Sequence, residues 1–206
     1  MQYFTLLFFG FLAAVLGVSL PGLLNMTAVK IAKEKGKKEV LYYVLGALVV
    51  IFIQTYIAIF FAKLIDSSST IKEILHEVGL IIFGALTVYF LGFAKRKNKQ
   101  KKEKPEKRGG AFVYGMFLAA VNVFSIPYYV FLSVTLSSYG YTIFKAPFTG
   151  IFSGGVVLGS ALMFYIYVSL FRKKSVEETF VLRNINYIIG SITGIISLIT
   201  VYKLLQ

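Results

Sequence analysis

Six long stretches of this chain contain no charged residue, and they constrain its fold more than any other feature. They cover residues 1–29, 40–62, 78–94, 109–144, 146–171 and 184–202. A helix that rises about 1.5 Å per residue needs roughly 20 apolar residues to cross the hydrocarbon of a bilayer. We therefore expect one membrane-spanning helix from each stretch and an all-α membrane protein with six transmembrane helices.

Two of the stretches need a more detailed interpretation. The 78–94 stretch is short for a span, so its helix is expected to begin earlier, near Ile74. The 109–144 stretch is too long for one straight span and too short for two. It predicts a helix over about 111–136, followed by a loop through Ser137, Ser138 and Gly140.

The composition excludes several classes of protein. Hydrophobic residues make up 57% of the chain and charged residues 15%. A typical soluble domain has about 45–50% apolar residues and about 25% charged residues. The composition therefore excludes a water-soluble globular protein. The chain has no cysteine and one histidine. These counts exclude thiol chemistry and argue against a metal centre held by Cys or His, so we expect no cofactor and no metal.

The basic residues indicate the topology. Loops 30–39, 95–108 and 172–183 hold 18 of the 22 Lys and Arg residues. Because basic residues in short loops stay in the cytoplasm, we expect a multi-pass protein of the cytoplasmic membrane with these loops inside and both termini outside. The net charge of +13 then reflects topology and contact with anionic lipid. Nucleic-acid binding is not expected, since no aromatic residue interrupts the basic run for base stacking.

The basic loop divides the chain into two similar halves. Residues 1–94 form a predicted first three-helix repeat, 95–110 the cytoplasmic loop, and 111–206 a second three-helix repeat. Three is an odd number of spans, so the halves insert with opposite orientation. That arrangement is typical of inverted-repeat transporters, which bind substrate near the bilayer midplane at interrupted helices.

The first helix of each half carries a proline and an asparagine together. Pro21, Gly22 and Asn25 lie in the first half, and Asn122 and Pro127 in the second. Proline lacks an N–H group and clashes with the carbonyl four residues back, so each helix is predicted to break and to release a carbonyl. Amides beside such breaks suit a zwitterionic substrate. Ordinary proline kinks packed against neighbouring helices would give the same pattern, and both interpretations stay open.

With these segments the chain resembles the LysE/RhtB family of amino-acid exporters over nearly its whole length. The family's first helix has a small residue and Pro-Gly-Pro before a basic loop, and here Ser19-Leu20-Pro21-Gly22-Leu23 precedes a loop that begins at Lys30. The family's Asn-Pro element of the fourth span corresponds to Asn122, with Pro127 five residues later. The resemblance implies six spans and export of small polar solutes.

The chain departs from the family in two places, which marks it as a divergent branch. Leu23 replaces the second proline of Pro-Gly-Pro. Family members often carry an acidic residue in the second span, whereas Gln54 is the nearest polar residue here.

We therefore expect a secondary transporter that exports amino acids or similar small polar metabolites by alternating access. Tyr128 follows Pro127 within the fourth span and offers a hydroxyl and a ring face to an ammonium group. The expected substrate site comprises Pro21, Gly22, Asn25, Gln54, Asn122, Ser125, Pro127 and Tyr128. The glycine pairs 150/154, 155/159 and 190/194 predict close helix packing, within the bundle or between protomers of a homodimer.

Two other classes of function compare differently with these features. The basic loop suits a non-transporting membrane protein that docks partners or anionic lipid. An enzyme is not expected, because the uncharged stretches hold no acid, base or metal ligand. The coupling of transport stays open between the charge of the substrate and an outer cluster of Glu73, His76 and Glu77.

Overall fold

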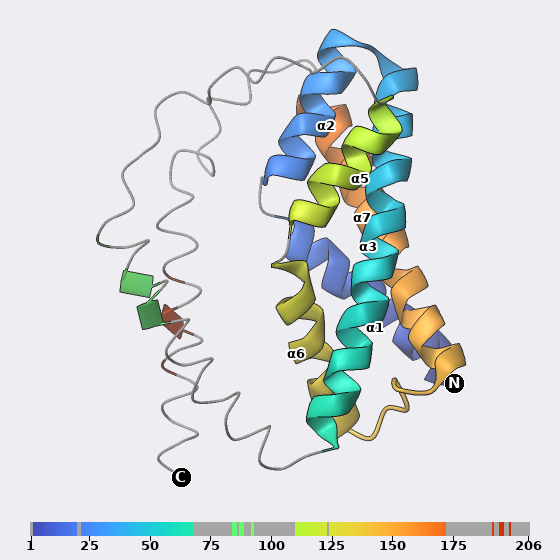
Figure 1. Ribbon diagram of the computed structural model, residues 1–206, viewed down its shortest axis with the longest axis vertical. Helices are drawn as coiled ribbons and strands as arrows, with labels where there is room; N and C mark the ends of the chain where they lie inside the picture. The colour runs from blue at the N-terminus through green and yellow to red at the C-terminus, as the bar shows by residue number, and fades with distance from the viewer. Residues whose placement is uncertain are drawn as a thin grey trace. The chain divides into compact units, whose positions relative to one another are not determined.

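The computed structural model describes residues 2–19, 22–67, 110–122 and 124–171, together with the isolated positions 84, 85, 87, 88, 92, 191, 194, 195 and 198 (Figure 1). All regular secondary structure in these residues is helical. The helices are α1 (Gln2–Val18), α2 (Leu23–Glu34), α3 (Lys37–Asp66), α5 (Ala111–Val121), α6 (Ser125–Ser138) and α7 (Ala146–Phe171).

Two of the helices, α3 and α7, are long and apolar enough to cross a membrane. The pairs α1–α2 and α5–α6 also meet that test when each pair is taken together, although they bend by 78° and 63°. The described residues therefore provide two spans, or four if each bent pair is one broken span. The predicted third and sixth spans lie outside the described residues except for isolated positions, so the count of six stays a prediction.

The chain forms two compact units, and each unit draws on both predicted repeats. One unit contains Met1–Ser67 and Arg108–Val176, and the other contains Ser68–Lys107 and Glu177–Gln206. In the second unit, a Cβ built on Gly194 would lie 3.4 Å from the Cγ2 atom of Thr87, so these two positions lie close together. The boundaries of the two repeats stay a prediction.

In the first unit, each broken pair packs against the continuous helix of the other half. Helix α1 packs most extensively on α7, and α5 packs most extensively on α3. Figure 1 shows α3 running past both α5 and α6. At the end of this interface the Ser137 hydroxyl donates to the Asp66 carboxylate over 2.8 Å.

Glycines allow these helices to approach closely. A Cβ on Gly10 would overlap the Phe152 carbonyl of α7, and a Cβ on Gly155 would overlap the Leu7 carbonyl of α1. Gly46 of α3 and Gly115 of α5 meet the partner backbone in the same reciprocal way. Small residues let transmembrane backbones come close enough for dispersion contacts, which replace the hydrophobic effect as the source of helix association in lipid.

The glycine pairs in the 146–171 stretch behave differently from one another. The prediction of close packing is confirmed for Gly155 and Gly159, both of which face α1. At Gly150 and Gly154 no described atom lies within 4 Å of an added Cβ, so these two glycines do not serve packing among the described helices, and a contact between protomers stays a prediction. All four glycines have the spacing of a small-residue packing motif. Among the described helices, only the two on the side of α7 that faces α1 make close contacts.

Two predicted boundaries are corrected. The first basic loop, expected over 30–39, shrinks to Lys35 and Gly36, where Gly36 has a φ of 87°. The lysines on either side belong to α2 and α3, because lysine is a good helix former and its charge reaches water from a helix end. The helix expected to end near residue 136 continues to Ser138, and the turn follows at Tyr139 and Gly140.

Candidate substrate site at the helix breaks

The first break separates α1 from α2. Helix α1 ends at Val18, and Gly22 precedes α2 with an extended backbone, at a φ of −108° and a ψ of 178°. Pro21, a predicted site residue, lies outside the described residues. Because the last carbonyls of a helix have no partner within it, the break must satisfy them in another way.

Side chains donate hydrogen bonds to the carbonyls that the first break releases. The Nδ2 atom of Asn25 donates to the Val18 carbonyl over 3.0 Å. The Tyr167 hydroxyl of α7 donates to the Ser19 carbonyl over 2.5 Å. The Ser19 hydroxyl donates to the Leu16 carbonyl over 2.7 Å. Each of these three carbonyls therefore has its own side-chain donor.

The second break separates α5 from α6, and a side chain of α3 donates a hydrogen bond to it. Asn122 caps α5 with a non-helical backbone, at a φ of −76° and a ψ of 67°. The Nε2 atom of Gln54 donates to the Ala119 carbonyl over 3.0 Å. Pro127 is the third residue of α6, where a missing N–H group costs little because the first turn has no intrahelical acceptor for it. The break therefore precedes the proline.

Ser125 connects the second break to the same glutamine. Its hydroxyl oxygen lies 2.9 Å from Gln54 Oε1 and 2.8 Å from the Asn122 carbonyl oxygen. Gln54 was predicted as a site residue in the second span, and Ser125 and Asn122 in the fourth; the fold brings them together.

Tyr128 links the two breaks. Its hydroxyl donates to the Ala13 carbonyl of α1 over 2.8 Å. A Cβ on Gly17 would lie 3.0 Å from the Tyr128 ring, so the ring lies directly against the last turn of α1. The helix after the second break thus contacts the helix before the first.

The predicted site residues differ in burial. Asn25 and Gln54 are buried, and Ser125 and Tyr128 are half-buried. Gly22, Asn122 and Pro127 are exposed. The two asparagines are therefore not equivalent, since Asn25 braces its break from within the core whereas the Asn122 side chain lies at the surface of the described helices.

Sequence reasoning did not identify Tyr167, which donates across the bundle to the first break. It also missed Tyr43 of α3, whose hydroxyl donates to the Leu24 carbonyl in the first turn of α2 over 3.1 Å. A tyrosine in an apolar stretch is the only available signal, and the chain has fourteen tyrosines. The outer cluster of Glu73, His76 and Glu77 lies outside the described residues.

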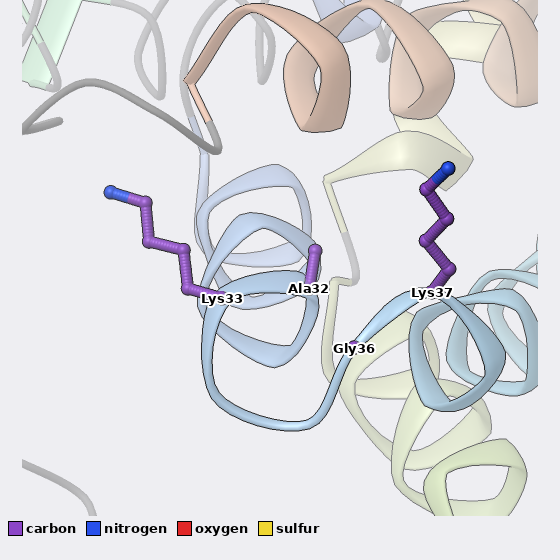
Figure 2. A pocket seen from close by; sticks show the side chains of 4 residues that line it. All are labelled: Ala32, Lys33, Gly36 and Lys37. Carbon is purple, nitrogen blue, oxygen red and sulfur yellow. The ribbon is translucent and has the colours of Figure 1, made fainter.

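A hollow lies at the turn between α2 and α3, lined by Ala32, Lys33, Gly36 and Lys37. Figure 2 shows the two lysine side chains extending away from each other on opposite sides of this turn. It belongs to the basic end of these helices and contains none of the predicted site residues.

Comparisons of the chain with known protein families, with curated proteins and with solved structures find no match.

Proposed function

We propose that this protein is a secondary transporter that exports amino acids or similar small polar metabolites across the cytoplasmic membrane. The observation that carries the proposal is the pair of broken, apolar helices, one in each half, each braced by a side chain from a continuous helix of the other half. Broken helices at matching places in two halves are typical of transporters that bind solutes between their repeats.

The bracing supports a mechanism of alternating access. Gln54 and Tyr167 hold the carbonyls of the opposite half, so movement of one half against the other changes the hydrogen bonds at the breaks. A solute with an ammonium and a carboxylate group offers donors and acceptors that replace those contacts. In this proposal the protein has six spans in two inverted repeats, binds lipid, carries no cofactor and catalyses no reaction. The basic loops are cytoplasmic and the termini are outside.

The resemblance to the LysE/RhtB exporters agrees with this proposal and suggests the class of solute. The cargo itself is found by comparing the metabolites released from cells with and without the protein. A solute that accumulates outside only when the protein is present is the substrate.

The test of the site is efflux of that solute from cells that express variants. We expect Asn25→Leu and Asn122→Leu to abolish efflux while the protein still inserts in the membrane. Ser138→Ala, at the exposed end of α6, serves as a control that keeps efflux. Normal efflux in both asparagine variants would contradict the site as drawn.

Deletion of residues 97–107 separates transport from docking. A transporter keeps efflux without this part of the basic loop, whereas a protein that docks partners through the loop loses its function. Efflux that disappears with the loop, in a protein that still inserts with the same topology, would favour docking.

A further inference from the structure

Three oxygen atoms meet at the second helix break with one hydroxyl proton among them. They are Ser125 Oγ, Gln54 Oε1 and the Asn122 carbonyl oxygen, with Ser125 Oγ within 2.9 Å of both others. The amide and carbonyl oxygens accept hydrogen bonds and cannot donate them. The single serine proton serves one acceptor well at any moment, and the backbone N–H of Ser125 reaches the Asn122 carbonyl over a long 3.4 Å. The cluster therefore has more acceptors than protons.

The orientation of the Gln54 amide explains why the cluster has more hydrogen-bond acceptors than donated protons. Its Nε2 atom donates to the Ala119 carbonyl over 3.0 Å, which leaves Oε1 toward Ser125. A flipped amide would place two oxygens together at Ala119. Gln54 is buried with 6% of its surface exposed, so water does not surround this amide. A buried acceptor that shares its only hydroxyl donor with a second acceptor is less well satisfied than one with a donor of its own, and this raises its desolvation cost.

The helix ends at the break favour a positive charge over a negative one. The C-terminus of α5 carries the partial negative charge of its last carbonyls. The N-terminus of α6 has the opposite sign, but two of its first three residues contribute little to it. Pro127 has no N–H group, and the N–H of Ser125 points to the Asn122 carbonyl.

We propose that Gln54, Ser125 and the Asn122 carbonyl form a Na⁺ site at the second break. Na⁺ has nearly the ionic radius of Ca²⁺ and takes oxygen ligands at about 2.4 Å, which places neighbouring ligands about 3.4 Å apart. The oxygens around Ser125 lie 2.8 and 2.9 Å from its Oγ atom and need to open by only about half an ångström. Ligands around an ammonium group stand about 4.6 Å apart, because N–H···O distances are about 2.8 Å. The cluster is therefore closer to the geometry of a bound ion than to that of a substrate amine.

The ligands also select the charge of the ion. All three are neutral oxygens, whereas divalent cations are held by carboxylates in most protein sites. The 109–144 and 40–62 stretches, which provide the ligands, contain no charged residue. The proposal that Na⁺ binds here does not depend on the proposed transport function. The role of this Na⁺ site in coupling solute export to an ion gradient does rest on that function. Na⁺ would then take the place of the titratable group that proton-driven carriers hold in the membrane.

The first break provides the contrast within the same protein. There, Asn25, Tyr167 and Ser19 each donate to a different carbonyl, so each of these carbonyls has a donor of its own. No cation is expected at that break. Ser19→Ala removes a hydroxyl from the first break and Ser125→Ala removes one from the second, which makes a matched pair.

The test measures ion binding to the purified full-length chain in detergent, with no solute present. Thermal unfolding is followed in NaCl, KCl, methylammonium chloride and choline chloride at equal ionic strength, and equilibrium binding of radioactive Na⁺ is measured in parallel. We expect Na⁺ to raise the melting temperature by several degrees in a saturable way, beyond the other three salts. Ser125→Ala is expected to weaken Na⁺ affinity by about ten-fold or more, and Ser19→Ala to leave it unchanged.

Each outcome decides the proposal. Equal melting temperatures in all four salts, with no saturable Na⁺ binding, overturn it, and so does equal loss of affinity in both serine variants. Stabilisation by methylammonium alone assigns the cluster to a substrate amine instead and overturns the Na⁺ site. If Ser125→Ala does not fold, Ser125→Thr keeps the hydroxyl and must keep saturable Na⁺ binding. If the protein exports solute normally but does not bind Na⁺, only the proposal of a Na⁺ site is rejected. If it binds Na⁺ but exports no solute, only the proposed transport function is rejected.

Discussion

The hydroxyl of Tyr128 donates a hydrogen bond to the carbonyl oxygen of Ala13 over 2.8 Å. This bond joins α6, which follows the second break, to α1, which precedes the first. Ala13 is buried and Tyr128 is half-buried, so the contact lies at the margin of the core. It is one of several hydrogen bonds that connect the two broken segments to helices of the opposite half.

Tyr128→Phe tests the value of this link. The substitution keeps the ring against Gly17 and removes only the donor, so we expect a loss of about 0.5–1.5 kcal/mol in the free energy of unfolding. Tyr139→Phe is the control, because Tyr139 is 79% exposed at the end of α6. Thermal unfolding of both variants in detergent gives the comparison, and equal melting temperatures would show that the Ala13 bond contributes nothing measurable.

Gly155→Ala tests the close approach of α7 to α1. The added Cβ overlaps the Leu7 carbonyl, which belongs to backbone and cannot rotate away, so we expect about 1–3 kcal/mol of destabilisation. The neighbouring Gly154→Ala meets no described atom within 4 Å and replaces a poor helix former by a good one. It should leave the melting temperature unchanged or raise it slightly. A lower melting temperature in Gly154→Ala than in Gly155→Ala contradicts the packing described.

Gln54→Leu removes the donor that serves the Ala119 carbonyl and leaves a buried polar group with one partner fewer. We expect about 1–3 kcal/mol of destabilisation, since the buried Ala119 carbonyl keeps only the N–H of Asn122 as a donor and the Ser125 hydroxyl loses one of its acceptors. Gln2→Leu is the matched control, because the Gln2 amide accepts one exposed hydrogen bond from Thr142. Chemical unfolding of the two variants measures the difference, and a larger effect at Gln2 would contradict a bracing role for Gln54.

Ser160→Ala should leave stability unchanged or raise it. The Ser160 hydroxyl is fully buried in α7 and has no hydrogen-bond partner among the described residues. Its removal relieves up to about 1–3 kcal/mol of desolvation cost. The Ser133 hydroxyl donates to the Tyr129 carbonyl over 2.7 Å, so Ser133→Ala should not raise the free energy of unfolding. A clear loss of stability in Ser160→Ala alone would show that this hydroxyl has a partner after all.

The local features of the breaks could be predicted from the sequence. Proline restricts its neighbours and lacks an N–H group whatever surrounds it, so Pro127 indicates an interruption at any depth. The interruption nevertheless lies before the proline, between the end of α5 at Val121 and the start of α6 at Ser125, because the first turn of a new helix accommodates the ring. Periodicity could not reveal this shift, since the stretch is apolar on every side.

The partners of the breaks could not be predicted in the same way. Gln54 stands 65 positions from Ala119, and Tyr167 stands 148 positions from Ser19. Nothing local to either residue specifies which carbonyl it reaches. The two asparagines look equivalent along the chain, yet Asn25 is buried and Asn122 is exposed, because burial depends on which helices pack nearby.

The amino-acid sequence by itself determined that the described part of this protein is helical and apolar enough to enter a membrane, since a backbone in hydrocarbon must satisfy its hydrogen bonds within a helix. The tertiary structure alone decided which glycines meet a neighbouring backbone, which side chains donate to the released carbonyls, and that three oxygens at the second break share one hydroxyl proton. These are contacts between residues far apart along the chain, and they exist only once the helices have packed.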